Sequence, residues 1–197
     1  VEPEEVAVAM NELHQAGKVR AFGVSNHSAM QIELLQEAAD LPVVANQLEV
    51  GLAHPDLIAS GTAVNQREPE HAMRSGDALE YCRLTGITVQ AWSPLSRGIY
   101  SGRGVGSAGD GEPERVGGQD PAVQATTELV DTLAAEYGVS REAIVVSWVM
   151  RHPAPILPVI GTTNPDRIWK CAEADSIYLE RLHWYQLLEA ARGMPMP

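Results

Sequence analysis

The segment Ile156-Leu-Pro-Val-Ile-Gly161-Thr-Thr-Asn164-Pro-Asp-Arg167 contains an apolar run, a glycine and the start of a helix. Its first five residues predict a buried strand of a parallel sheet, covered on both faces. Asn164 suits the N-cap of the helix, Pro165 its first position and Asp166 its first turn. Such a helix start directs free backbone N–H groups at one point, where phosphate can bind. Arg167 adds a charged fork for a phosphate monoester, although an ordinary βα turn with a solvated arginine fits the same residues.

The composition indicates a soluble globular protein that does not bind polyanions over a broad surface. The 197 residues are 45% hydrophobic and 20% charged, with a net charge of −12 and a pI of about 4.8. This acidity argues against nucleic acid or an anionic membrane as partner, so an anionic ligand would need a local basic patch. We recognise neither a signal peptide nor an apolar run that could span a bilayer. Cys82 and Cys171 lack metal-type spacing, so we expect reduced thiols in a cytoplasmic protein and no metal site.

Four apolar runs alternate with predicted helices along the chain. We expect strands near residues 20–25, 43–49, 87–92 and 156–160. Strands that alternate with helices predict a parallel α/β sheet with right-handed crossovers. Residues 51–76 predict a long loop with a helical turn. Residues 99–120, rich in glycine, serine and charge, predict a long loop that is either a functional lid or disordered.

The apolar spacing within the helices predicts which side chains face the core. In the first helix, which Gly17 ends, these are Val6, Met10 and Leu13. Trp148 and Trp184 are also expected in the core. In the last helix the predicted inward residues are Leu179, Leu182, Tyr185 and Leu188.

Polar and aromatic side chains stand at the carboxyl ends of the predicted strands, where α/β proteins place their ligands. They are Ser25 and Asn26, Gln47, and Trp92. The amides can pair with a carboxamide and the indole can stack on a pyridine ring, so a nicotinamide fits this set. A turn or capping role for Ser25 is the competing interpretation.

Four motifs, in this order, resemble those of the aldo-keto reductases: Gly17-Lys-Val-Arg-Ala-Phe-Gly-Val-Ser-Asn26, Asn46-Gln47, Ala91-Trp-Ser-Pro-Leu95 and Gly161-Thr through Arg167. The resemblance extends from about Val6 to Leu188. It implies a (β/α)8 TIM barrel that reduces carbonyls with NADPH. A complete barrel usually takes ~250 residues, and this chain starts at Val1 without methionine. We therefore expect residues 1–197 to be one partial domain, the C-terminal half of the barrel with strands five to eight.

The resemblance also implies a role for individual residues in binding NADP(H). Ser25, Asn26 and Gln47 would hold the nicotinamide carboxamide, and Trp92 would stack on its ring. The pyrophosphate would follow Ser93, Leu95, Ser96 and Gly98, with loop 99–120 folded over it. Thr162 and Arg167 would meet the adenosine 2′-phosphate, with help from Lys170. The cofactor-binding set is completed by Pro94, Ile160, Gly161 and Thr163.

Two departures from the family pattern concern the 2′-phosphate and the adenine. Many family members have lysine where Gly161 stands and asparagine where Cys171 stands. A preference for NADP over NAD therefore depends mainly on Arg167.

No catalytic residue is assigned, because the family's catalytic aspartate, tyrosine, lysine and histidine come from its first four strands. Tyr81 and Tyr100 are poor replacements, since nothing nearby in sequence would lower a phenol pKa from ~10. Four histidines are expected at the surface or at helix ends, because no carboxylate or cysteine stands at ligand spacing from them: His54, His71, His152 and His183.

Two functions follow from the sequence. The first is an NADP(H)-dependent oxidoreductase that reduces small aldehydes or ketones to alcohols, with the catalytic residues supplied upstream. The alternative is a non-catalytic NADP(H)-binding half-barrel that serves as a binding or sensing module. In either case the open strand edges of a half-barrel would favour self-association.

Overall fold

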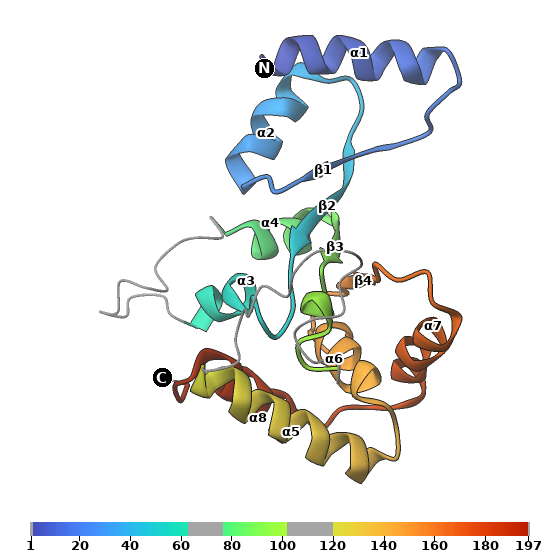
Figure 1. Cartoon of the computed structure of the whole chain (residues 1–197). Coiled ribbons are helices and arrows are strands. Elements are labelled where there is room, and N and C mark those ends of the chain that lie inside the picture. The colour runs from blue at the N-terminus through green and yellow to red at the C-terminus, as the bar shows by residue number, and fades with distance from the viewer. Residues whose placement is uncertain (1, 63–76, 102–119, 197) are drawn as a thin grey trace.

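Four parallel strands form one sheet in chain order, β1-β2-β3-β4 (Figure 1). The computed structural model describes residues 2–62, 77–101 and 120–196. The strands are β1 (Phe22–Ser25), β2 (Val43–Glu49), β3 (Thr88–Trp92) and β4 (Leu157–Val159). All three strand pairs are parallel, which confirms the four predicted strands and their arrangement.

Helices connect and follow the strands. The α-helices are α1 (Pro3–Gln15), α2 (Ala29–Ala38), α3 (Asp56–Ala59), α4 (Ala78–Thr85), α5 (Pro121–Tyr137), α6 (Arg141–Met150), α7 (Pro165–Ala172) and α8 (Arg181–Arg192). Short 3₁₀ helices are η1 (Ser60–Thr62), η2 (Ser96–Gly98) and η3 (Glu173–Ser176). The helical turn expected within 51–76 is α3 with η1. Most of the predicted loop 99–120, namely residues 102–119, lies outside the described residues, as do residues 63–76.

The ends of the helices follow the capping residues of the sequence. Ser28 and Gln31 form the predicted capping box, in which each side chain bonds to the backbone of the other. The side chain of Asn164 accepts the N–H of Arg167 at 3.2 Å and so caps α7. Gly86 ends α4 in the left-handed conformation, with φ of 76°. Local sequence therefore determines where these helices begin and end.

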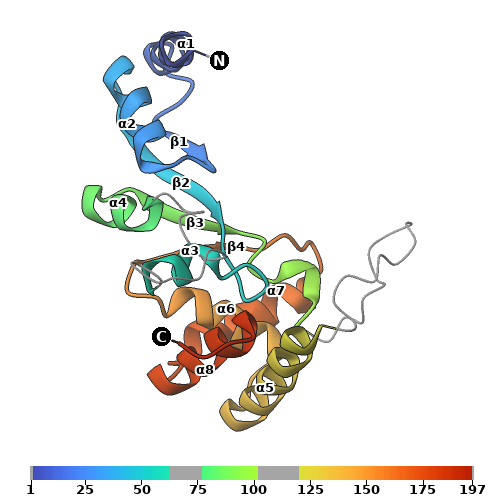
Figure 2. The ribbon, with the colours of Figure 1, turned by 90° about the vertical axis from the view of Figure 1, so that its left-hand side faces the viewer.

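The two faces of the sheet differ in what covers them. Neighbouring residues Asn46 and Val89 are buried, as are Leu48 and Ala91, on the face that packs on the helices. Figure 2 shows α2 and α4 on the same side of strands β1 to β3. The opposite face, which we call the open face, carries two rows of paired residues: Gln47, Gln90 and Leu157, and Glu49, Trp92 and Val159.

The prediction that residues 156–160 are covered on both faces is wrong for this structure. Leu157 is 53% exposed and Val159 is 41% exposed. Side chains alternate across a strand, so these two point to the open face, which no described helix covers. Ile156, just before β4, is buried at 2% exposure. The apolar run is thus a strand, but only one of its sides is packed.

Two helices differ in part from the predicted inward faces. In α1, Met10 is buried and Val6 packs on the core as predicted, but Leu13 is 40% exposed. In α8, Leu182 is 63% and Tyr185 is 42% exposed. Leu179, which lies before the helix, and Leu188 are buried as predicted. The buried residues of α8 are Trp184, Leu187 and Leu188.

A tryptophan pair joins α6 to α8, as expected for two core residues. The rings of Trp148 and Trp184 are stacked, with centroids 5.5 Å apart and planes at 11°. Each indole Nε1 donates to the backbone carbonyl of the other tryptophan, at 3.1 and 2.9 Å. Trp148 is fully buried and Trp184 is 9% exposed. The pair therefore combines apolar burial with satisfied N–H groups, as a buried indole requires.

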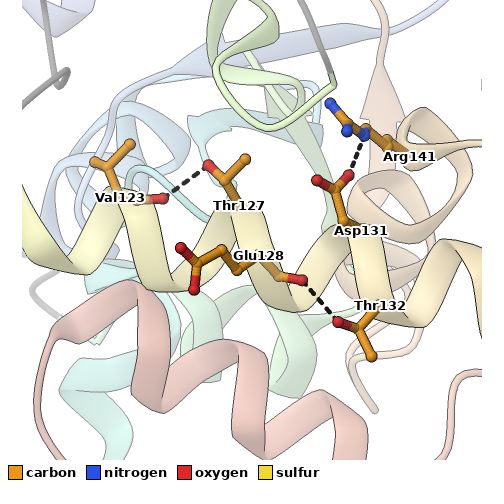
Figure 3. Close-up of polar contacts among 6 residues, drawn as sticks. All are labelled: Val123, Thr127, Glu128, Asp131, Thr132 and Arg141. Atoms are coloured by element: carbon orange, nitrogen blue, oxygen red, sulfur yellow. Dashed lines mark hydrogen bonds and ion pairs between the residues drawn. The ribbon is translucent and has the colours of Figure 1, made fainter.

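Polar contacts add a link at the corner between α5 and α6 (Figure 3). Asp131 on α5 forms an ion pair with Arg141 at the start of α6. Their side chains are 40% and 39% exposed, so the pair contributes ~1 kcal/mol or less. The hydroxyls of Thr127 and Thr132 donate to carbonyls four residues earlier in the same helix, at 2.8 and 2.9 Å. Apolar packing, more than this polar corner, holds the helices together.

We predict that Trp148→Phe lowers the free energy of unfolding by ~2–3 kcal/mol. The change removes one buried hydrogen bond, worth ~1 kcal/mol, and leaves a void beside Trp184. The matched control is Trp169→Phe, because Trp169 is 74% exposed and its change should stay within ~0.5 kcal/mol. Urea unfolding followed by far-UV circular dichroism measures both, and equal losses would contradict the prediction.

Candidate functional site

The carboxyl ends of β1 and β3 are joined by a side-chain hydrogen bond across β2. Trp92 Nε1 donates to Asn26 Oδ1 at 3.2 Å. Asn26 has a left-handed backbone, with φ of 56°, and its N–H donates to the carbonyl of Gln47 at 3.0 Å. An asparagine tolerates this conformation better than most residues. The structure therefore brings Asn26, Gln47 and Trp92 together, and holds one edge of the indole in place.

Ser25 and Gln47 complete this group at the ends of the strands. Ser25 Oγ donates to the carbonyl of Gln47 at 3.0 Å, so its hydroxyl has a structural role at the end of the strand. The oxygen of that hydroxyl can still accept a bond from a ligand. The side chain of Gln47 donates to Gln90 Oε1 at 2.9 Å, on the open face. The four predicted residues thus form one hydrogen-bonded cluster.

Asn46 is a supporting residue that was not assigned a role from the sequence. It is fully buried, on the helix-covered face of β2. Its Nδ2 donates to the carbonyl of His27 at 2.8 Å, and its Oδ1 accepts the His27 N–H at 3.5 Å. Asn46 therefore fastens the turn that carries Ser25 and Asn26. A buried amide within an apolar strand needs such partners, and this requirement could have identified it.

The turn after β3 has an unusual backbone. Ser93, Ser96 and Arg97 have φ of 53°, 47° and 57°, a region that few residues other than glycine adopt. The turn is closed by bonds from Ser96 N to the carbonyl of Ser93 at 2.9 Å and from Gly98 N to that of Leu95 at 2.7 Å. Strained non-glycine residues cluster at functional sites. The predicted Ser93–Gly98 segment is therefore a compact, strained turn beside Trp92.

Gly51 permits another segment to approach this turn closely. A Cβ at Gly51 would lie 2.9 Å from the carbonyl oxygen of Pro94 and 3.3 Å from that of Ser93. It would also lie 3.3 Å from Ser96 Oγ. The loop after β2 therefore packs directly against the turn after β3, and only a glycine fits at position 51.

The turn after β4 leads into the basic face of α7. Thr162 Oγ1 accepts the N–H of Asn164 at 3.2 Å, and Gly161 and Thr163 are exposed. Arg167 and Lys170 are three residues apart on α7 and so lie on one side of the helix. No carboxylate forms an ion pair with either of them among the described residues. Arg167 and Lys170 are thus the candidates on α7 for the local positive charge that an anionic ligand would need in an acidic chain.

Contacts from α6 and its preceding turn hold α7 in position. The carboxylate of Glu173 accepts the backbone N–H of Ser140 at 2.8 Å, and Ser140 Oγ donates to the carbonyl of Lys170 at 3.0 Å. The bonds with Ser140 lower the pKa of Glu173 below its ordinary value. Burial raises the pKa of the nearby Cys171 thiol, as does Glu142, whereas the charge of Arg167 acts in the opposite direction. Cys171 is therefore an apolar packing residue in this structure.

Neither tyrosine considered as a proton donor is suited to that role. The hydroxyl of Tyr81 donates to the carboxylate of Glu33, which raises the pKa of Tyr81 to about 12. Burial raises the pKa of Tyr100 to about 12 as well. Both values agree with the expectation that these phenols would not be activated.

The histidines serve local contacts. His54 lies 3.8 Å from Asp56, and His183 bonds to the hydroxyl of Tyr137 at 2.9 Å. Burial lowers the pKa of His152, and His71 lies outside the described residues. Across 2–62, 77–101 and 120–196, no three His, Cys, Asp or Glu side chains are grouped as metal ligands would be. Over the same ranges, no helix is long and apolar enough to cross a bilayer.

Comparison with known proteins adds a family match over most of the chain. A sequence model of the Aldo/keto reductase family matches residues 1–187. The 6-dehydroglucose reductase of Agrobacterium fabrum is 31% identical, over 98% of this chain and 54% of that protein. Oxidoreductase YdhF of Escherichia coli is 30% identical, over 100% of this chain and 55% of that protein. The chain thus spans about half the length of the curated relatives it matches.

Solved structures share the fold. The thermostable aldo-keto reductase Tm1743, crystallised with the inhibitor epalrestat, superposes with a TM-score of 0.68 and 21% identity, covering 96% of this chain and 55% of that one. Aldose reductase from Giardia lamblia gives a TM-score of 0.64 and 17% identity, covering 96% and 50%. These neighbours support a barrel-type α/β fold. The predicted correspondence to the C-terminal half is not confirmed, since the family match begins at residue 1 of this chain.

We predict that Gly51→Ala displaces the turn at 93–98 and lowers the free energy of unfolding by ~1–3 kcal/mol, because the new methyl group would overlap backbone atoms. The control is Gly61→Ala, whose Cβ would meet only the end of the flexible Glu80 side chain, at 3.0 Å. Its effect should stay within ~0.5 kcal/mol. Urea unfolding measures the stability of each variant, and amide chemical shifts report any displacement of the turn. Unaltered resonances for residues 93–98 in the Gly51 variant would disprove the close contact.

Proposed function

Because the chain belongs to the aldo/keto reductase family, we propose that it carries most of the NADP(H) site of an oxidoreductase that reduces aldehydes or ketones to alcohols. The observation that carries this proposal is the bond between Trp92 and Asn26 beside Gln47, at the carboxyl ends of parallel strands. An indole held by one edge can stack on a nicotinamide ring, while the two amides meet its carboxamide. Ligands of α/β barrels bind at this end of the strands.

The phosphates of the cofactor would follow the next two turns. In this proposal the pyrophosphate lies along the strained turn after Trp92, and the adenosine 2′-phosphate lies at the start of α7. The positive dipole end at that helix start, together with Arg167 and Lys170, favours a dianion. Arg167 offers a planar fork without a carboxylate partner among the described residues. These features support NADP over NAD.

We further propose that this chain is the C-terminal half of its barrel, and that the proton donor comes from outside residues 1–197. The chain spans 54% of the Agrobacterium relative, and the described sheet has four of a barrel's eight strands. When NADPH is bound, its nicotinamide supplies hydride to the carbonyl carbon. The residues of this chain would hold the ring in position and exclude water from one of its sides. The name of that relative suggests an oxidised hexose as one carbonyl to test.

A non-catalytic NADP(H)-binding module is the second candidate. The raised pKa values of Tyr81 and Tyr100, each about 12, favour it for the chain alone, because neither phenol could supply a proton readily. No strand of the described residues pairs with the outer edges of β1 and β4, and such edges would then favour self-association, which sedimentation analysis would detect. Turnover measurements separate the two candidates.

Arg167→Ala should weaken the binding of NADPH tenfold to a hundredfold and leave NADH binding nearly unchanged. Only NADPH has the 2′-phosphate, and a charged hydrogen bond is worth ~1.5–3 kcal/mol. Arg83→Ala is the matched control, since Arg83 is an exposed arginine in the last turn of α4. Isothermal titration with both cofactors provides the measurement. Equal weakening of both would assign Arg167 a structural role.

The chain alone should reduce activated aldehydes, such as a nitrobenzaldehyde, barely above background. A placed general acid contributes typically ~10²–10⁴-fold, and stabilisation of the developing alkoxide a similar factor. Fusion to the first half of the Agrobacterium relative should therefore raise NADPH oxidation by several orders of magnitude. Rapid turnover by the chain alone, lost in Tyr81→Phe or Tyr100→Phe, would refute the proposed division of roles.

A further inference from the structure

Gln90 is a polar side chain in the middle of β3, on the open face of the sheet. It lies directly across from Gln47 on one side and Leu157 on the other. Its Oε1 accepts a hydrogen bond from Gln47 Nε2 at 2.9 Å. Leu157 offers no polar group, so Gln47 is the cross-strand partner to which Gln90 can bond. The position was not selected from the sequence, because the pairing of the two strands is visible only in the sheet.

In the orientation found here, this bond leaves the oxygen of the Gln47 amide available to a ligand. A primary amide has one acceptor oxygen and one donor NH₂ group, and rotation by 180° exchanges them. Because Gln90 takes a hydrogen from the NH₂ group, the oxygen of Gln47 points elsewhere. Within the described ranges, no donor contacts that oxygen. Gln47 is therefore prepared to accept a hydrogen bond.

Asn26 is prepared in the opposite sense. Its Oδ1 already accepts the indole N–H of Trp92 at 3.2 Å, which leaves its NH₂ group as the free part of the amide. A nicotinamide carboxamide has one acceptor oxygen and one donor NH₂ group. A site with one free donor and one free acceptor matches the oxygen and the NH₂ group of the carboxamide. It discriminates against a ring substituent that lacks one of these two groups.

We propose that Gln90 is a positioning residue that orients Gln47, so that the Oε1 of Gln47 accepts the carboxamide NH₂ of the nicotinamide. The assignment rests on the proposed function, since it concerns the same cofactor site. Gln90 acts through Gln47 and does not itself contact the cofactor. Without it the Gln47 amide would rotate, and cofactor binding would have to order that side chain.

Two forms of the cofactor test this role. NADPH carries the carboxamide NH₂, whereas reduced 3-acetylpyridine adenine dinucleotide phosphate has a methyl group in its place and keeps the carbonyl. Gln90→Leu should weaken NADPH binding about three- to tenfold, as expected for one neutral hydrogen bond, and leave the analogue unaffected. Gln90→Glu keeps an acceptor for Gln47 and should bind NADPH within about twofold of the unaltered chain.

The control is Thr88→Val, which replaces another open-face residue of β3 that pairs with Ala45 instead of Gln47. It should alter neither dissociation constant. Binding is measured by equilibrium dialysis on chains that show the circular dichroism spectrum of the unaltered protein. If the Gln90→Leu variant does not fold, Gln90→Met takes its place.

Equal losses for both nucleotides, or none for NADPH, would overturn the role of Gln90. If the unaltered chain binds no NADPH, the proposed function itself fails, and this assignment with it.

Discussion

The alternation of side chains along β2 is the constraint on which the candidate site depends. Asn46 and Gln47 are neighbours with the same amide group, yet they face opposite sides of the sheet. Asn46 is buried against the helices and holds the turn after β1 through His27. Gln47 faces the open side and bonds to Gln90. A shift of the strand by one residue would exchange these environments, leaving a buried glutamine without its partners and the turn unsupported.

The open face explains why so apolar a strand as β4 is half exposed. Parallel sheets are normally covered on both faces, because the helices that connect the strands pack on the sheet and the rest of the fold covers what they leave open. Here Leu157 and Val159 lie on a face that no helix of the described residues covers, in rows with Gln90 and Trp92. These rows contain both apolar and amide side chains, as expected of a surface that packs partly on protein and partly on a polar ligand. The same face thus accounts for the exposed leucine and for the position of the site.

What could be predicted from the sequence was mainly local. Ser28, Asn164 and Gly86 mark helix ends because capping depends on a few neighbouring residues. The four strands followed from the apolar runs, and the cluster of polar strand ends followed from the side chains just after those runs. Exposure could not be derived in this way, since the apolar run of β4 contains no information on what covers it. Gly51 and Gln90 required the sheet itself, because their partners are more than forty residues away in the chain.

The bond between Trp92 and Asn26 shows how much of the site is formed without a ligand. It joins the ends of two strands that are not neighbours in the sheet, and it uses the indole N–H, which a phenylalanine would not have. The indole and the Asn26 amide are therefore oriented by each other, as the amide of Gln47 is by Gln90. Side chains that are already ordered lose little entropy when a ligand binds. On the proposed function, these ordered side chains would hold the nicotinamide, while the groups for proton transfer would come from another part of a barrel.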